Sequence, residues 1–277
     1  MTNDTGRNTI AGPAPSTGDL LLVGEGLHVM NPALVRAIEE RDKERILDMA
    51  RRQVAAGADA LDLNLGQSRE LCRRMSWLVE LVQEEMETAF FLSSHVLRLE
   101  QALRVHRGRA TINAVTADER ELAGAMEKAM AFDAGLVVLL VSPDLSPFGV
   151  DERLQLAARV LETAARTGME PGRLYLDPVI SCRPDPMTWH LGGGLPDMET
   201  IIESIRMIGE LSDRQVKTIV ALSNASVCLP AGRRSDLHCR LLPMLVEAGL
   251  DAVILNCSDA RLMAIARDPG ASLRTAA

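Results

Sequence analysis

Eight short runs rich in Val, Ile and Leu alternate along this chain with longer segments whose apolar residues recur at helical spacing. Strands that alternate with helices form parallel sheets, and eight such units in 277 residues favour closure into an α/β fold of the TIM (β/α)8 barrel type. An open doubly wound sheet shows the same periodicity, so the number of units and the length decide for the barrel. The predicted strands are residues 20–25, 60–65, 89–94, 110–115, 136–142, 173–178, 217–223 and 252–257. The predicted helices are residues 33–57, 70–86, 96–107, 117–134, 150–168, 197–211, 234–248 and 259–267.

Residues that begin or end helices support this assignment at several places. Thr116–Glu119 has the pattern of a capping box, in which the threonine hydroxyl and the glutamate each satisfy a backbone N–H at a helix start. Ser258–Asp259 offers a second cap after the last predicted strand. Gly57, Gly135 and Gly249 are expected where helices stop before the next strand.

The composition supports one large domain and excludes several classes of function. With 47% hydrophobic residues the chain can bury a single core, and we assign residues 19–277 to the barrel and 1–18 to a flexible N-terminal tail. The net charge of −8 and the lack of a dense Lys/Arg block argue against a nucleic acid partner. The N-terminal segment lacks the apolar core of a signal peptide or membrane anchor. Five cysteines without C-x-x-C spacing indicate reduced thiols, so we expect a cytoplasmic protein with no membrane association.

Several predicted strands end on a side chain that can hydrogen-bond a ring, namely Asn64, Asn113, Asp177 and Asn224. The carboxyl ends of barrel strands meet on one face, where barrel enzymes place their chemistry. Amides offer a donor and an acceptor together and a carboxylate accepts two parallel N–H bonds, so the set suits a planar heterocycle with an aminopyrimidinone edge. Asp62 shares the inward face of its strand with Asn64, where it either contacts the ligand or belongs to a polar layer that stabilises the barrel.

Two segments that follow late strands are longer than the other connections. They are Ile180–Pro196 and Ala225–Ser235. Both lie on the face that carries the polar strand ends, so they either close over a ligand or are ordinary solvated insertions.

Five segments resemble, in order and spacing, those of the pterin-binding methyltransferase family. They are Val23–Glu25, Leu61–Gly66, Ile112–Asn113, Leu176–Pro178 and Leu222–Ser226. Within the family the chain is most similar to the methyltetrahydrofolate:corrinoid/iron-sulfur-protein methyltransferases, which are related to the folate domain of cobalamin-dependent methionine synthase and, more distantly, to dihydropteroate synthase. The resemblance covers residues from about 20 to 267 and implies a barrel like that of dihydropteroate synthase.

The resemblance implies a reaction and its participants. A methyl group moves, in either direction, between N5 of methyltetrahydrofolate, or a related tetrahydropterin, and the cobalt of a corrinoid such as cobalamin. The chain has no D-x-H-x-x-G corrinoid signature and no length for a second domain, so the corrinoid is expected on a separate protein. Members of this type are commonly homodimers, and we carry that expectation over.

The resemblance also implies roles for single residues. Asn113 and Asp177 hold the pterin ring, while Asn224 moves onto the N5 region and is the expected catalytic residue. Asp62 and Asn64 match the D-x-N pattern of the family, which lines the same site. The expected pterin-binding residues are Asp62, Asn64, Ser93, Asn113, Asp177, Ser223, Asn224 and Ser226.

Two segments depart from the family pattern. Where related sequences read G-E-R-I/T-N after the first strand, this chain has Gly26 in place of the arginine and His28 in place of the asparagine. At the end of the third predicted strand, Ser93 stands where the family has an aspartate that contacts the pterin. Losing a charge-assisted hydrogen bond typically costs about 1.5–3 kcal/mol. We therefore expect weaker folate binding, a different pterin, or another carboxylate in this role.

Three alternatives stay open at this point. Cys182, Cys228 and Cys257 follow the last three strands, as thiolate ligands of a zinc-dependent corrinoid methyltransferase would, but no H-x-C pattern accompanies them and we predict no bound metal. A dihydropteroate synthase needs cationic residues near the ends of the last two strands to hold pyrophosphate, and this chain has Ser223–Asn224 and Asn256–Asp259 there. The third alternative is a barrel that binds a pterin without catalysis, which only the two departures support.

Overall fold

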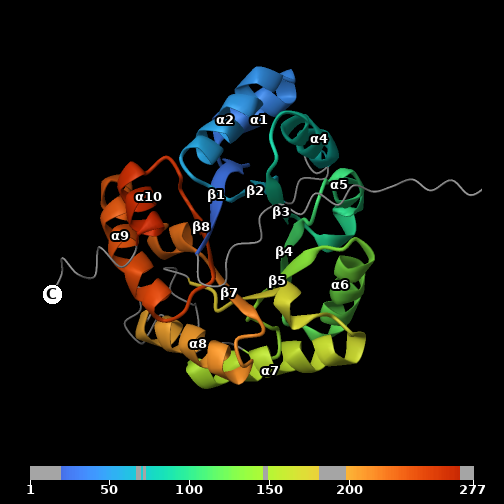
Figure 1. Cartoon of the computed structure of the whole chain (residues 1–277), viewed down its shortest axis with the longest axis vertical. Helices are drawn as coiled ribbons and strands as arrows, with labels where there is room; N and C mark the ends of the chain where they lie inside the picture. Colours follow the sequence, from blue (N-terminus) through green and yellow to red (C-terminus); the bar gives the residue numbers. More distant parts are fainter. Residues whose placement is uncertain (1–19, 67–69, 71–72, 146–148, 181–197, 269–277) are drawn as a thin grey trace, which may run out of the picture.

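The strands close into a barrel in sequence order, each parallel to its neighbours. The computed structural model describes residues 20–66, 70, 73–145, 149–180 and 198–268. Within them the strands pair as β1-β2-β3-β4-β5-β6-β7-β8 in a closed ring (Figure 1), which confirms the predicted (β/α)8 barrel. The strands are β1 (Leu21–His28), β2 (Ala60–Asn64), β3 (Ala89–Ser93), β4 (Thr111–Thr116), β5 (Gly135–Leu139), β6 (Leu174–Asp177), β7 (Lys217–Ala221) and β8 (Ala252–Leu255).

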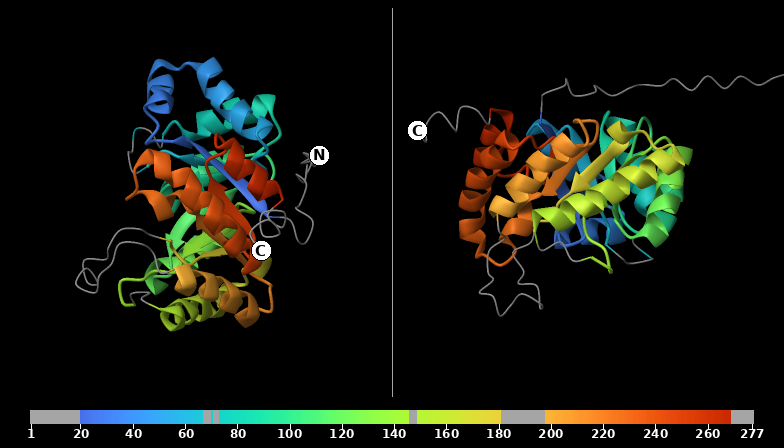
Figure 2. Two further views of the ribbon diagram at one scale, coloured as in Figure 1. Left: turned by 90° about the vertical axis from the view of Figure 1, so that its left-hand side faces the viewer. Right: turned by 90° about the horizontal axis from the view of Figure 1, so that it is seen from below.

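The helices surround the barrel on the outside, as the two side views show (Figure 2). The α-helices are α1 (Pro32–Glu40), α2 (Lys43–Ala55), α4 (Met75–Glu85), α5 (Glu100–Val105), α6 (Glu119–Ala131), α7 (Val150–Thr167), α8 (Met198–Leu211), α9 (Ala231–Glu247) and α10 (Ala260–Arg267). The described residues also include the 3-10 helices η1 (Val96–Arg98), η2 (Pro171–Arg173) and η4 (Leu222–Ser226). In the described part of the chain, none of the helices has the length and apolarity to span a membrane.

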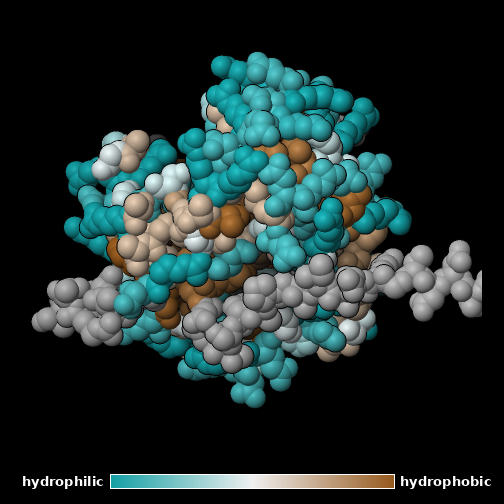
Figure 3. Space-filling model, turned by 45° about the horizontal axis from the view of Figure 1, so that its top comes forward, coloured by the Kyte–Doolittle hydropathy of each residue, from teal (hydrophilic) through white to brown (hydrophobic). Residues whose placement is uncertain are grey.

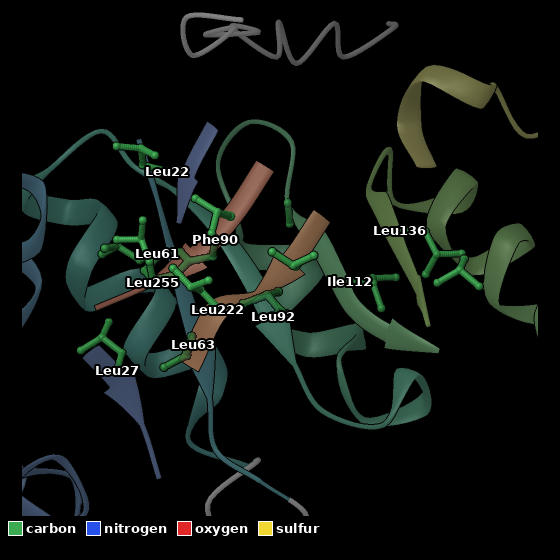
Figure 4. Close-up of a cluster of buried hydrophobic side chains, with 14 of the residues drawn as sticks. Leu22, Leu27, Leu61, Leu63, Phe90, Leu92, Ile112, Leu136, Leu222 and Leu255 are labelled. Atoms are coloured by element: carbon green, nitrogen blue, oxygen red, sulfur yellow. The ribbon is translucent and has the colours of Figure 1, made fainter. Parts of the chain in front are cut away.

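Alternate strand residues build two apolar clusters, one on each face of the closed sheet. The larger cluster lies between strands and helices and includes Leu61, Leu63 and Leu92 (Figure 4). The smaller cluster fills the inside of the barrel with Val23, Ala60, Phe91, Val137, Tyr175, Ile219, Ala252 and Ile254. Because side chains alternate along a strand, the outward leucines of β2 turn Asp62 toward the barrel interior, in line with the inward face predicted for it.

The single helix predicted over residues 33–57 is wrong, because two helices occupy this range. Arg41 ends α1 in the left-handed conformation, with φ 55°, and the Asp42 side chain then caps α2 by accepting a hydrogen bond from the Arg45 N–H at 3.1 Å. The apolar spacing continues across the break, so periodicity alone joined the two helices. Gly57 and Gly249 stand where predicted, with φ of 104° and 97° after α2 and α9.

The predicted capping box and one glycine stop are also wrong. Thr116 is the last residue of β4, and Asp118 caps α6 instead, accepting from the Arg120 N–H at 3.0 Å. Gly135 begins β5, and the left-handed residue after α6 is Asp133, with φ 50°. The cap predicted before α10 is confirmed, since Asp259 accepts from the Leu262 N–H at 3.0 Å.

The long segment predicted as a loop at Ala225–Ser235 is largely helical. Strand β7 ends at Ala221, η4 follows directly, and α9 already begins at Ala231. The other predicted long loop, apart from Ile180, and the N-terminal tail at 1–18 lie outside the described residues. The predicted seventh strand, 217–223, is therefore two residues too long, because the 3-10 helix η4 begins at the buried Leu222.

The exposed surface is mainly hydrophilic on the face drawn in Figure 3, with hydrophobic residues in the gaps between hydrophilic ones. Among the described residues the exposed large hydrophobic side chains are Met30, Leu211, Val227 and Met244. Met30 follows the end of β1 and Val227 follows η4, so two of them stand at the carboxyl ends of strands, beside the polar residues described next.

Candidate functional site

Three neighbouring strands bring a carboxyl, a hydroxyl and an amide together inside the carboxyl end of the barrel. The Ser93 hydroxyl donates to Asp62 Oδ1 at 2.6 Å, and Asn113 Nδ2 donates to the same oxygen at 3.1 Å. Register explains the meeting, because Ser93 pairs with Asn64 on one side and with Asn113 on the other. Asp62 is 3% exposed and Ser93 is 6% exposed. Three predicted site residues, Asp62 of β2, Ser93 of β3 and Asn113 of β4, therefore form one hydrogen-bonded cluster.

Burial dominates the electrostatics of this cluster. The pKa of Asp62 is raised to about 6, mainly by desolvation on burial. The nearby charge of Glu25 also raises it, and the hydrogen bonds from Ser93 and Asn113 lower it. Both of these donors reach the same oxygen of Asp62, Oδ1. Near neutral pH this carboxyl changes easily between its charged and neutral forms.

Glu25, on β1, belongs to the site although it is absent from the predicted residues. It accepts a hydrogen bond from the Ser223 hydroxyl at 2.7 Å, and burial raises its pKa while that hydrogen bond lowers it. Its charge also acts on Asp62. Glu25 has the same strand parity as the inward Val23, so the alternation rule contained the signal that sequence reasoning missed.

Asp177 closes the other side of the site at the end of β6. It is 8% exposed, and its Oδ1 accepts from the Val179 N–H at 2.7 Å. Burial raises its pKa to about 7, against the backbone hydrogen bond and the positive charge of Arg153, which lower it. Arg153, on α7, donates to the backbone oxygens of Pro178 and Gly149 at 2.8 and 2.9 Å, so it also holds the chain that leaves β6.

Asn64 and Asn224 present amides at this face in different settings. Asn64 Oδ1 accepts from the Gly66 N–H at 3.0 Å, which leaves its Nδ2 group to donate. Asn224 lies on η4 with its side chain exposed, and it makes no side-chain hydrogen bond to another described residue. Ser226, two residues on, is 1% exposed and its hydroxyl is engaged with protein groups.

The segment that departs from the family pattern in β1 is held by Gln53 of α2. The Gly26 N–H donates to Gln53 Oε1 at 2.7 Å, and a Cβ at position 26 would lie 2.7 Å from Gln53 Cδ. A side chain at position 26 would therefore displace the Gln53 amide. His28 Nδ1 accepts from the Met30 N–H at 2.9 Å, and burial lowers the pKa of this histidine.

The cysteines named for the zinc alternative lie in different environments. Cys228 is exposed, whereas Cys257 is 4% exposed and burial raises the pKa of its thiol to about 11. Cys182 lies outside the described residues. Among the residues that are described, no three His, Cys, Asp or Glu side chains are grouped so that they would hold a metal ion.

As a whole, the carboxyl end of the barrel offers acceptors and amides to a flat ring rich in N–H groups. Ser93 and Asn113 both donate to Asp62, Ser223 donates to Glu25 on the neighbouring β1, and Asp177 stands near the charge of Arg153. A carboxylate accepts two parallel N–H bonds, and amides complete the recognition of an edge that both donates and accepts. The chemistry suits an aminopyrimidinone ring.

Comparison with known proteins points to the same chemistry. The sequence profile of a family described as pterin binding enzyme matches residues 33–256. A methylcorrinoid:tetrahydrofolate methyltransferase of Eubacterium limosum is 24% identical over 248 residues, which are 88% of this chain and 88% of that protein.

Solved structures show where the fold recurs. A dihydropteroate synthase from Stenotrophomonas maltophilia with active site-bound imidazole has a TM-score of 0.65 at 13% identity, and 94% of each chain is covered. The dihydropteroate synthase from Thermus thermophilus has a TM-score of 0.61 at 19% identity, covering 90% of this chain and 93% of that one. These likenesses show a common fold. Because the family profile spans most of the barrel, from α1 to the end of β8, this chain belongs to the pterin binding enzyme family.

Proposed function

We propose that this chain is a methyltransferase that moves a methyl group, in either direction, between N5 of methyltetrahydrofolate, or a related tetrahydropterin, and the cobalt of a corrinoid on a partner protein. One observation carries the proposal. The face that holds the Asp62 cluster also presents the exposed amide of Asn224, just beyond the end of β7. The name of the Eubacterium limosum relative, a methylcorrinoid:tetrahydrofolate methyltransferase, supports the same reaction.

In this proposal the carboxyls and amides of the barrel hold the pterin ring. Asp177 accepts two N–H groups of the ring, and Asn113 and Asn64 provide amides around it. Asp62 takes the role that the family gives to an aspartate of the third strand. The Ser93 hydroxyl donates to Asp62 at 2.6 Å, so the carboxyl group of β2 stands against the end of β3, where the family aspartate is missing.

The proposed chemistry takes place at N5, where Asn224 acts. A tertiary amine is a poor leaving group, so N5 needs a proton or a strong hydrogen bond when its methyl group departs. The Asn224 amide is too weak an acid to supply that proton, but it donates a hydrogen bond toward N5 or positions a water there. The corrinoid supplies a cobalt that accepts or delivers the methyl group.

A dihydropteroate synthase reaction fits this chain less well. Pyrophosphate release requires cations near the ends of the last two strands, and here those positions hold Asn224 and Asn256. Arg233 and Arg234 come nearest in sequence, but they lie in the first turn of α9, and Arg234 Nε donates to the Leu229 carbonyl at 3.1 Å.

An anaerobic methyl-transfer assay tests the proposal. The protein is mixed with cob(I)alamin and methyltetrahydrofolate, and the cobalt absorption spectrum is followed; the reverse reaction uses methylcobalamin and tetrahydrofolate. We expect conversion in at least one direction. No conversion in either direction would refute methyl transfer with free cofactors.

Parallel arms distinguish the alternatives. Turnover of p-aminobenzoate with a pterin pyrophosphate would instead indicate a synthase, and calorimetric binding of methyltetrahydrofolate without turnover would indicate a binding protein. One tightly held zinc per chain in a metal assay would favour the thiolate alternative. The homodimer and the cytoplasmic location stay predictions, which sedimentation and cell fractionation address.

A further inference from the structure

Two of the five residues of the 3-10 helix η4, Ser223 and Ser226, are held by side-chain hydrogen bonds, while Asn224 between them is exposed. Such short 3-10 turns have poor internal hydrogen-bond geometry, so their position depends on contacts with neighbouring elements. What holds η4 therefore sets where Asn224 stands.

One tie comes from β1 and the other from α9. The Ser223 hydroxyl donates to Glu25 Oε2 at 2.7 Å. The Ser226 hydroxyl donates to the Ser223 carbonyl at 3.1 Å, and His238 Nε2 lies 2.8 Å from Ser226 Oγ. A hydroxyl has a single proton, and Ser226 uses it in the hydrogen bond to the Ser223 carbonyl. The His238 ring therefore carries its proton on Nε2 and donates to Ser226 Oγ.

His238 is 6% exposed, on the side of α9 that packs against η4. A position that needed only volume would be filled by a hydrocarbon, since burying an imidazole without hydrogen bonds is costly. Burial lowers the pKa of this histidine, which keeps the ring neutral at physiological pH. The neutral, buried donor fits a fixed structural tie.

We propose that His238 is a positioning residue for Asn224. Its hydrogen bond to Ser226 fixes the backbone of η4 from behind, Glu25 fixes it from the barrel side through Ser223, and the exposed amide between the two ties is held within reach of the ligand. Ser226 then acts through the backbone, with its hydroxyl turned into the protein. The catalytic consequence rests on the proposed methyl transfer, but the geometric claim does not.

Two substitutions at the same position separate the hydrogen bond from packing. His238→Leu keeps apolar volume and loses the donor, whereas His238→Gln places an amide nitrogen near the position of Nε2. Met244→Ala, at an exposed residue of the same helix, serves as the control. Thermal unfolding verifies that each variant is folded.

Hydrogen–deuterium exchange of the peptide covering residues 222–228 reads the position of η4 without any need for activity. We expect His238→Leu to raise amide exchange there about tenfold, while His238→Gln and Met244→Ala stay within about twofold of the wild type. Equal exchange in His238→Leu and the wild type would overturn the geometric claim. Faster exchange over the whole of α9 would show a packing defect and would also count against it.

Steady-state methyl transfer reads the consequence for Asn224. We expect His238→Leu to lower kcat about tenfold with little change in the KM for the pterin, and His238→Gln to restore most of it. Adding His238→Leu to Asn224→Ala should have almost no further effect, because the histidine acts through the asparagine. Multiplicative losses in the double variant would refute the positioning role. If the wild type itself shows no turnover, the exchange experiment still decides the geometric claim.

Discussion

Two layers of side chains fill the barrel interior, and on the same strand they are contributed by inward-facing residues two positions apart. On β3, Phe91 packs inside the barrel and Ser93, two residues later, donates to Asp62. On β6, Tyr175 packs inside and Asp177 follows at the strand end. The lower layer consists mainly of apolar and aromatic side chains, and the upper layer carries carboxyls, hydroxyls and amides. Stability and ligand recognition are therefore separated by only two residues along each of these strands.

The upper layer has a cost that depends on pH. The folded-state pKa values of Asp62, about 6, and Asp177, about 7, lie above the ordinary aspartate value of 3.8. Between the ordinary and the raised values the folded chain binds more protons than the unfolded chain, so stability falls as pH rises through this window. Below about pH 4 this penalty is absent, and above about pH 7 it is complete.

The largest effect is expected from the lower layer. Phe91→Ala should lower the free energy of unfolding by about 3–5 kcal/mol, because it leaves a cavity in the barrel interior. It also removes an edge-on contact with Tyr175, whose ring centroid lies 5.6 Å from that of Phe91. Urea denaturation measures the change. Pterin affinity of the folded fraction should stay near that of the wild type. A loss below about 1 kcal/mol would mean that the lower layer does not carry the stability assigned to it.

The next effect concerns the exposed amide above the upper layer. Asn224→Ala should reduce methyl-transfer turnover roughly 100- to 1,000-fold, the range for losing one donor to a developing charge, with little loss of pterin binding. Stopped-flow single turnovers and calorimetry measure the two quantities separately. Losses of equal size in both would make Asn224 a binding residue only.

Asp177→Asn tests whether recognition and stability oppose each other in the upper layer. The variant cannot offer a charged acceptor, so pterin affinity at about pH 8 should fall about 10- to 100-fold. The free energy of unfolding should rise at that pH, and this gain should shrink as pH falls from about 7 toward about 4. Calorimetry and urea denaturation over this range measure the two quantities. A variant that binds the pterin as tightly as the wild type would show that the charge of Asp177 is not used in recognition.

The wild-type protein supplies the matching pH measurement. Its pterin affinity should increase as pH rises through about 7, where Asp177 ionises, and then level off. That dependence should be lost in Asp177→Asn, apart from the part due to Asp62 near pH 6. An affinity that stays flat in the wild type between about pH 6 and about pH 8 would contradict the charged-acceptor role.

The smallest effect is expected at Ser93. Ser93→Ala removes one of two hydrogen bonds to Asp62 Oδ1 and should raise the pKa of Asp62 above its value of about 6. Pterin affinity should weaken about 3- to 10-fold, and more at about pH 6.5 than at about pH 8. Calorimetry at the two pH values measures the difference. If affinity is unchanged at both, Ser93 does not place Asp62 for the ligand.

The barrel was predictable from the sequence because apolar alternation is a local property. The eight predicted strands overlap the observed ones, and the inward orientation of Asp62 followed from the outward leucines beside it. Local patterns fail to predict single residues whose backbone conformation differs from that of the flanking residues. Arg41 is a good helix former in the left-handed conformation, and Leu222 is as buried as a strand residue although it begins a 3-10 turn.

The parts of the site that the sequence did not predict depend on distant contacts. Ser223 meets Glu25 across 198 positions of the chain, and no local pattern joins them. Arg153 acts on Asp177 from a helix, and His238 reaches Ser226 from another, both through side chains whose helical spacing marks them only as buried. Closing the barrel creates these contacts, so they follow from the fold and not from any segment.

The close packing of Gln53 on Gly26 constrains how this sequence can change. Gln53 is 5% exposed, and besides accepting from Gly26 its Nε2 donates to the Met49 carbonyl at 3.2 Å. Any side chain at position 26 would first meet the Gln53 amide. A larger residue at position 26, such as arginine, would therefore have to displace this amide and its hydrogen bonds. The effect of a substitution at position 26 should therefore depend on which residue occupies position 53.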